Sequence, residues 1–279
     1  MSTNRILVLG LLVFLCLGTV LFFLPRSVVN NKQLASSDST LPDKPIIDKA
    51  GETDTMHALP AGVSQSLSAL KAKLNLETQT APKVDLLTAI ANGYKKANRF
   101  DSAGAYFEKA ASLANNPNLV YEAGNAYFEG IAFAGAPSKV EYLSAKARAL
   151  LSQVPEGSVK STESQAKMAL TWVNSETPMK GILKLRELAE KEPDNEFVVY
   201  QLGILSFQSG QYDKAVGRFK KVIEINPKSV NGYFYLAQSL TQLGQNREAL
   251  AAVQKGMPLA KEEDTKASFE ELKKQLSGN

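Results

Sequence analysis

The sequence predicts an all-α solenoid in which short helices pair and stack along the chain. From about residue 62 to the end, apolar residues recur at helical spacing, and no segment alternates in the manner of a β-strand. The turns between these helices are short and rich in Gly, Asn and Pro. Segments in the C-terminal third also match one another after a shift of 34 residues, which indicates stacked helical hairpins.

Composition excludes several classes of function. The formal net charge is +4, but residues 1–32 contribute +3 of it, and the rest holds 29 basic against 28 acidic side chains. Such a balance does not predict nucleic-acid binding. The single cysteine, Cys16, and the single histidine, His57, both precede the helical body that begins at about residue 62. We therefore expect no nucleophile–base pair, no metal site and no cofactor in the helical body.

The N-terminus predicts a membrane anchor. After a short tail of residues 1–5, residues 6–24 form a run of 19 residues without a charge, close to the ~20 that span a bilayer as a helix. Pro25 and Arg26 follow, without the small residues of a signal-peptidase site. An uncleaved transmembrane helix is the interpretation we favour, and a cleaved signal peptide is the alternative.

The orientation of this anchor is only weakly encoded. Arg5 lies on one side of the segment, and Arg26 and Lys32 lie on the other. A short tail with one basic residue favours a cytoplasmic N-terminus. Because anchored helical-repeat proteins are common in bacterial envelopes, we expect a single-pass protein of the bacterial inner membrane with its body in the periplasm.

Two segments connect the anchor to the repeats. Residues 25–61 are polar and carry little apolar periodicity, so they predict a flexible linker. Residues 62–76 place Val63, Leu67 and Leu70 at helical spacing. This segment predicts a helix that caps the N-terminal end of the solenoid.

The repeat is clearest between residues 198–227 and residues 232–261. Small, apolar and turn-forming residues recur after the shift of 34 positions. The pairs are Leu202 with Leu236, Gly203 with Ala237, Gly210 with Gly244, Ala215 with Ala249 and Phe219 with Val253. The same shift toward the N-terminus leads to Ala169, Leu185 and Pro193.

Each residue type in this pattern has a physical role. Small side chains at Gly203 and Ala215 allow two helices to cross closely, and Phe219 fills the space between units. Gly210 ends a first helix, where a left-handed backbone is needed. Pro227 stops the second helix.

These residues resemble the signature of the tetratricopeptide repeat, a 34-residue unit folded as helix–turn–helix. The resemblance covers residues 84–263 and implies a right-handed α-solenoid of about five units. It is looser in the earlier units, where residues 131–139 are inserted before a second helix expected at about 140–153. Residues 264–279 predict one more helix, which caps the C-terminal end.

The resemblance also implies a concave groove, lined by the first helices, that binds a protein or peptide. First-helix residues outside the signature are expected to point into it. These candidate binding residues are Asn92, Tyr121, Asn125, Phe128, Tyr200, Ile204, Phe207, Phe234 and Gln238. Such a mixture of aromatics and amides suits a peptide. The alternative is that the aromatic side chains pack against neighbouring helices and that the asparagines are solvated.

The sequence thus predicts a membrane-anchored, non-enzymatic scaffold or adaptor for a protein partner. Two alternatives remain open. The chain could be a self-associating structural element of a membrane or envelope assembly. It could also be a client-delivery factor for cofactor assembly or export.

Overall fold

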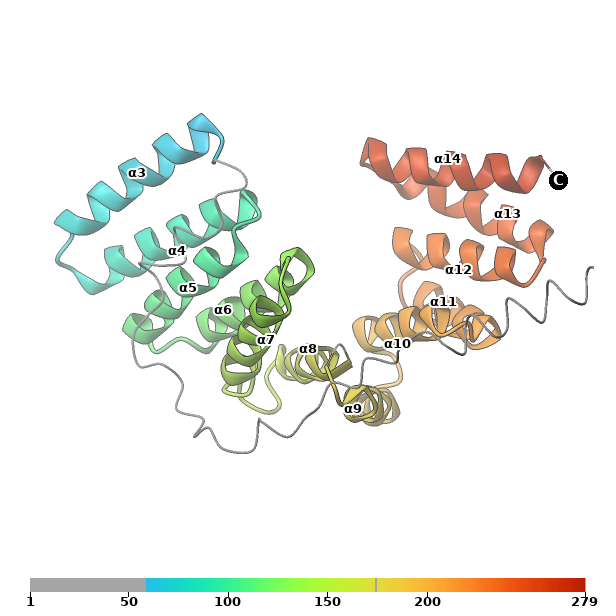
Figure 1. Cartoon of the computed structure of the whole chain (residues 1–279), viewed down its shortest axis with the longest axis horizontal. Coiled ribbons are helices and arrows are strands. Elements are labelled where there is room, and N and C mark those ends of the chain that lie inside the picture. The colour runs from blue at the N-terminus through green and yellow to red at the C-terminus, as the bar shows by residue number, and fades with distance from the viewer. Residues whose placement is uncertain (1–58, 174, 279) are drawn as a thin grey trace, which may run out of the picture. The chain divides into compact units, whose positions relative to one another are not determined.

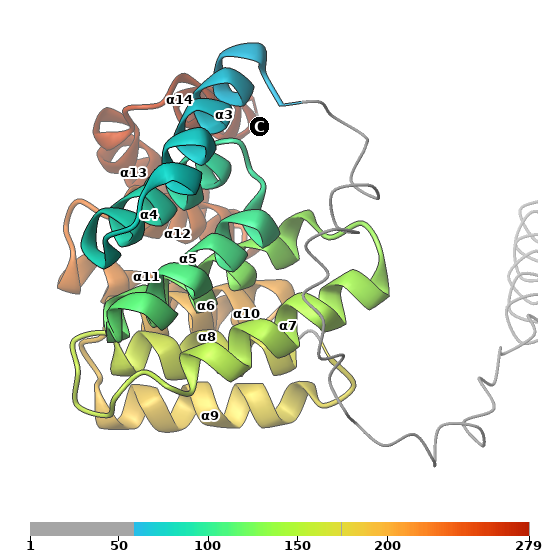
Figure 2. The ribbon, with the colours of Figure 1, turned by 90° about the vertical axis from the view of Figure 1, so that its left-hand side faces the viewer.

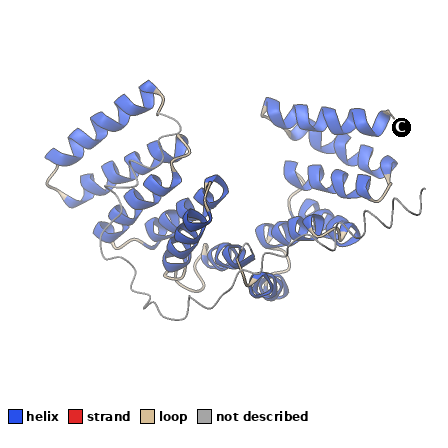
Figure 3. Cartoon of the chain, in the orientation of Figure 1, coloured by secondary structure: helices blue, strands red, loops and turns tan. Residues whose placement is uncertain are grey.

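The computed structural model describes residues 59–173 and 175–278 (Figure 1). This part of the chain contains twelve α-helices, two short 3-10 helices and no strand (Figure 3). The predicted membrane helix at 6–24 and most of the predicted linker at 25–61 lie outside the described residues. Within the described ranges, no helix is both long enough and apolar enough to span a bilayer.

Ten of the described helices form five hairpins, each made of a first and a second helix. The hairpins are α4 (Thr80–Lys96) with α5 (Phe100–Ala114), α6 (Pro117–Gly130) with α7 (Pro137–Leu151), α8 (Ser161–Val173) with α9 (Pro178–Lys191), α10 (Glu196–Gln208) with α11 (Tyr212–Ile225), and α12 (Val230–Gln242) with α13 (Asn246–Gly256). Consecutive helices pack on one another in chain order, as α3, α4 and α5 show in Figure 2. The all-helical solenoid predicted from the sequence is confirmed.

Single helices flank the hairpins. Helix α3 (Ala61–Leu76) precedes them and packs on α4, and α14 (Glu263–Ser277) follows them and packs on α13. The 3-10 helices η1 (Ile131–Phe133) and η2 (Met257–Leu259) extend the ends of α6 and α13. The two flanking helices coincide with the segments for which the sequence predicts capping helices.

The repeat residues take the positions that their chemistry requires. Gly210 and Gly244 follow first helices with φ of 72° and 71°, in the left-handed region where a side chain would be strained. A Cβ on Gly203 would come within 2.7 Å of Cε1 of Phe219, so a larger residue would force the Phe219 ring to shift at this helix crossing. Phe219 and Leu185 are fully buried. The 34-residue period of the sequence therefore corresponds to contacts between helices that recur in each unit.

The second hairpin departs from the regular unit. Residues 131–139 were predicted to be an insertion before a helix at about 140–153, but η1 occupies 131–133 and α7 already begins at Pro137. Proline is well tolerated at the first helical position because no partner for its missing N–H is needed there. The connection from α7 to α8, residues 152–160, is longer than any other between described helices. Helix α8 also packs less extensively on α7 than α6 does on α5.

First helices also contact one another across the hairpins. Helix α6 contacts α8, α8 contacts α10, and α10 contacts α12. We call the surface formed by these four helices the first-helix face. It carries eight of the nine residues predicted to bind a partner, and Asn92 lies on α4.

Candidate functional site

The predicted binding residues fall into two groups with different surroundings. One group lies on α6 and consists of Tyr121, Asn125 and Phe128. The other lies on α10 and α12 and consists of Tyr200, Ile204, Phe207, Phe234 and Gln238. Asn92 belongs to neither group and is exposed on α4.

The α6 group is held in a buried polar cluster with α8. The ammonium of Lys167 donates hydrogen bonds to Tyr121 Oη at 2.6 Å, Asn125 Oδ1 at 2.6 Å and Glu163 Oε1 at 2.7 Å. The Tyr121 hydroxyl donates to the same Glu163 oxygen at 2.6 Å. We call these four residues the Lys167 cluster. Its lysine is only 6% exposed, and all three of its N–H donors have acceptors.

Electrostatics explain how a lysine is tolerated at this depth. Burial lowers the pKa of Lys167, and the neighbouring Glu163 carboxylate opposes that shift. Burial alone would raise the pKa of Glu163, but hydrogen bonds from Lys167, Tyr121 and Lys160 lower it to about 2. Burial and the same carboxylate raise the pKa of Tyr121. The cluster is therefore a charged, fully hydrogen-bonded link between α6 and α8.

This arrangement changes the interpretation of Tyr121 and Asn125. Both were expected to point into a groove, but they are 4% and 6% exposed and are bonded to α8. The physical reason is Lys167, whose charge requires buried acceptors. Among the described residues, no buried side-chain nitrogen or oxygen lacks a hydrogen-bond partner. The Lys167 cluster accordingly offers a ligand no unused polar group.

The α10 and α12 group has apolar surroundings instead. Tyr235 on α12 lies at its centre, with its ring 6.0 Å from Tyr200, 5.8 Å from Phe207 and 5.5 Å from Phe219. Phe234 contacts the Tyr235 ring at 5.7 Å and Phe269 of α14 at 5.2 Å. We call Tyr200, Phe207, Phe219, Phe234 and Tyr235 the aromatic cluster. Phe219 is buried, whereas the other four rings are only half-buried.

The remaining two residues of this group extend the surface. Ile204 and Gln238 are half-buried on α10 and α12, beside the aromatic cluster. Burial raises the pKa of Tyr200 to about 12, so its phenol stays protonated and can donate a hydrogen bond. The structure thus brings together an apolar surface with amide and hydroxyl groups on first helices.

Sequence reasoning missed Lys167 and Tyr235, the central residue of each cluster. The period itself contains a signal for them, because Lys167, Gln201 and Tyr235 follow one another at the 34-residue spacing. They occupy the same place on α8, α10 and α12. From that place, Lys167 contacts Tyr121 and Tyr235 contacts Tyr200, each on the preceding first helix.

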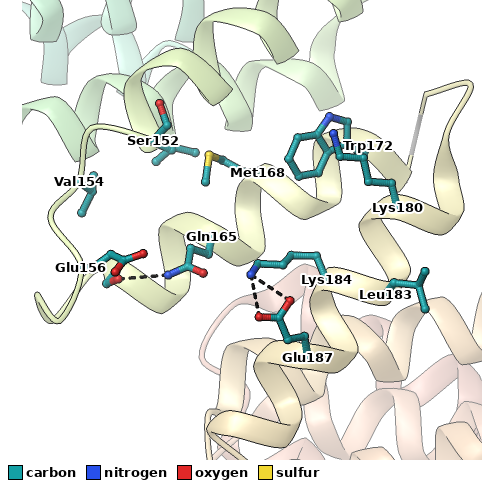
Figure 4. Close-up of a pocket in the computed structure, with 12 residues that line it drawn as sticks. Ser152, Val154, Glu156, Gln165, Met168, Trp172, Lys180, Leu183, Lys184 and Glu187 are labelled. Carbon is teal, nitrogen blue, oxygen red and sulfur yellow. Dashed lines mark hydrogen bonds and ion pairs between the residues drawn. The ribbon is translucent and has the colours of Figure 1, made fainter.

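A second candidate site lies between α7, α8 and α9, where the sequence predicts none. It is an open pocket of ≈ 530 Å³ (Figure 4), within the size range of ligand pockets. Its lining residues are Leu151, Ser152, Val154, Glu156, Ser161, Gln165, Met168, Trp172, Lys180, Leu183, Lys184 and Glu187. Among the described residues there is no group of acidic, His or Cys side chains that could hold a metal ion.

Comparisons with known proteins identify the repeats. Residues 84–117 and 206–268 match family models of the tetratricopeptide repeat. No match was found among curated protein sequences.

Solved structures share the fold. A tetratricopeptide repeat protein from Parabacteroides merdae is 18% identical, with a TM-score of 0.53 over 83% of this chain and 81% of its own. A thermophilic tetratricopeptide repeat protein from Thermus thermophilus is 16% identical, with a TM-score of 0.51 over 68% of this chain and 98% of its own. The chain therefore carries tetratricopeptide repeats and folds as a tetratricopeptide-repeat array over the residues that the structure describes.

Proposed function

We propose that this chain is a membrane-anchored, non-enzymatic scaffold whose first-helix face binds a segment of a partner protein at α10 and α12. Tetratricopeptide-repeat proteins generally mediate protein–protein interactions. The observation that carries the proposal is the half-buried outer part of the aromatic cluster. Tyr200, Phe207 and Phe234 leave part of each ring accessible on adjacent first helices.

The chemistry of this surface suits a peptide. Aromatic rings contribute large contact areas at little cost in side-chain entropy, and such residues are enriched among those that dominate binding energy. Gln238 and the Tyr200 hydroxyl lie beside the rings and can bond to a peptide backbone. The partner we propose is therefore a peptide segment that buries apolar side chains on the aromatic cluster.

The anchor in this proposal is the uncharged segment 6–24. It would fix the repeats to the bacterial inner membrane, with the body in the periplasm and residues 25–61 as a tether. Cys16 is the only native cysteine and lies within the segment, so an engineered cysteine can report topology. A Ser37→Cys variant should react with a membrane-impermeant maleimide in intact spheroplasts. Labelling only after lysis would place the body in the cytoplasm.

The proposed binding surface is tested by crosslinking the full-length chain in its native membranes. Wild type and a Tyr200→Ala, Phe207→Ala double variant are compared by mass spectrometry of the captured proteins. The proposal predicts one partner that is enriched with the wild type and lost with the variant, while circular dichroism shows the variant still folded. Recovery of only the chain itself, equally in both samples, would contradict the proposal and favour self-association.

A further inference from the structure

The pocket between α7, α8 and α9 is lined by a row of side chains, here called a stripe, along one face of each of two helices. Helix α8 contributes Ser161, Gln165, Met168 and Trp172, and α9 contributes Lys180, Leu183, Lys184 and Glu187. Both stripes have the spacing of a single helix face. The stripe on α8 lies on the opposite side of that helix from Glu163 and Lys167. The pocket is thus separate from the first-helix face.

The irregular second hairpin explains why this space is open. The long connection 152–160 replaces a tight turn, and α8 packs less extensively on α7 than α6 does on α5. Leu151 and Val154 form a buried apolar floor. Above that floor, Leu183 is 57% exposed, although it faces the pocket. An exposed leucine beside an apolar floor is a surface that a ligand can cover.

One cation in the pocket has an aromatic partner and no carboxylate. Lys180 Nζ lies 4.0 Å from the centroid of the Trp172 ring (Figure 4). Within the described ranges, no carboxylate forms an ion pair with Lys180. Lys184 differs, because its ammonium is paired with Glu187 at 3.0 Å. The Lys180 end of the pocket therefore presents an apolar ring beside an ammonium that forms no ion pair with a described residue.

We propose that this pocket binds a peptide segment of a partner protein in which an acidic side chain lies next to a bulky apolar one. The apolar side chain would pack on Met168, Trp172 and Leu183, and the carboxylate would accept a hydrogen bond from Lys180. Charge complementarity selects this occupant, since the exposed Lys180 ammonium has no ion-pair partner among the described residues and an acidic side chain would supply one. This site is additional to the surface proposed on α10 and α12.

The chain offers a direct probe of the pocket. Trp172 is its single tryptophan, so its fluorescence reports on this site alone. A random dodecapeptide library displayed on phage is panned on the full-length chain in detergent micelles, with a Lys180→Glu variant as the parallel target. Lys180 lies in the first turn of α9, where a glutamate favours the helix dipole, so this variant should fold. The consensus peptide, made without tryptophan, is then titrated.

The proposal predicts an enriched motif that combines an acidic with a bulky apolar residue. Its titration should shift the Trp172 emission saturably toward shorter wavelength, and Lys180→Glu should weaken binding at least about tenfold, as expected for loss of a charge-assisted hydrogen bond. A Lys220→Glu variant, which changes an exposed lysine on the second helix α11, should bind like the wild type.

Other outcomes would overturn the proposal. These are the absence of any enriched motif, a motif without acidic residues, and equal binding by Lys180→Glu. An emission shift caused by anionic lipid micelles, with no response to the peptide, would assign the pocket to a lipid surface instead. The Tyr200→Ala, Phe207→Ala variant should retain peptide binding here, so this site and the α10–α12 surface can fail independently.

Discussion

Two junctions between first helices use the same geometry with opposite chemistry. At the α6–α8 junction, Lys167 reaches back to Tyr121, which lies three residues before Gly124. At the α10–α12 junction, Tyr235 reaches back to Tyr200, which lies three residues before Gly203. One junction is a hydrogen-bonded ion cluster, and the other is a group of aromatic rings packed mostly edge to face.

The difference shows how one repeat can close a surface or leave it available. A buried ammonium requires specific acceptors, and Lys167 uses those that Tyr121 and Asn125 could have offered to a ligand. Aromatic packing has no such requirement, and Tyr200 and Phe207 remain only half-buried. The helical array determines where a binding site can lie. The side chain that contacts the preceding first helix decides whether the groups there are already bonded within the fold.

The largest expected effect concerns the core beneath the aromatic junction. Phe219→Ala removes a fully buried ring that contacts Gly203, Tyr200 and Tyr235. We expect a loss of about 4 kcal/mol in the free energy of unfolding, measured by urea denaturation followed by circular dichroism. Phe133→Ala, at a ring that is 62% exposed, is the control and should cost much less. Equal losses would mean that the aromatic junction contributes no special stability.

The next effect tests the polar junction. Lys167→Ala leaves the oxygens of Glu163 and Asn125 without their principal hydrogen-bond donor. We expect the free energy of unfolding to fall by about 3 kcal/mol. Lys167→Met keeps the packing of the aliphatic stem and should lose less. Urea denaturation of both variants measures the difference. If Lys167→Ala were as stable as wild type, the cluster would not hold α6 and α8 together.

Acid should weaken the polar junction selectively. The pKa of Glu163 is about 2 in the folded chain, below its ordinary value near 4.5. Its stabilisation is therefore complete above about pH 4.5 and is lost as the pH falls toward 2. Acid should therefore lower the free energy of unfolding less in Glu163→Gln than in the wild type. The difference should be on the order of 2 kcal/mol, which allows for the partial exposure of Glu163.

The measurement for Glu163 is the urea midpoint as a function of pH from 7 to 2. Glu248→Gln, at an exposed glutamate on α13, is the matched control and should keep the acid sensitivity of the wild type. Indistinguishable curves for Glu163→Gln and wild type would show that the ion cluster does not depend on this carboxylate.

The smallest expected effect is the difference in stability between variants of two asparagines that were both predicted to line the groove. Asn125 accepts from Lys167 and donates to Glu129 at 2.9 Å, whereas Asn92 is exposed. Asn125→Ala should lower the free energy of unfolding by about 1–2 kcal/mol. Asn92→Ala should leave that free energy within about 0.5 kcal/mol of the wild-type value. Thermal denaturation separates them. A larger loss at Asn92 would reverse the assignment of buried and exposed positions.

The sequence was sufficient to predict the fold because the repeat depends on local patterns. Apolar spacing identifies the helices, and Gly210 and Gly244 identify the ends of α10 and α12, without knowledge of distant contacts. The candidate site depends on pairs far apart in the chain, such as Tyr121 and Lys167. Whether a first-helix residue is available to a partner depends on the side chain that contacts it from the next first helix. No local sequence pattern contains that information. The pocket beside Trp172 likewise results from how the connection 152–160 is folded.

Site-specific photocrosslinking can show whether a partner contacts the first-helix face at α10 and α12. A benzoylphenylalanine residue is placed at Gln238, half-buried on the first helix α12, or at Gln254, exposed on the second helix α13. Each full-length variant is irradiated in native membranes. We expect a crosslinked partner from position 238 and none from position 254. A partner captured from position 254 alone would contradict the claim that the first-helix face at α10 and α12 binds the partner.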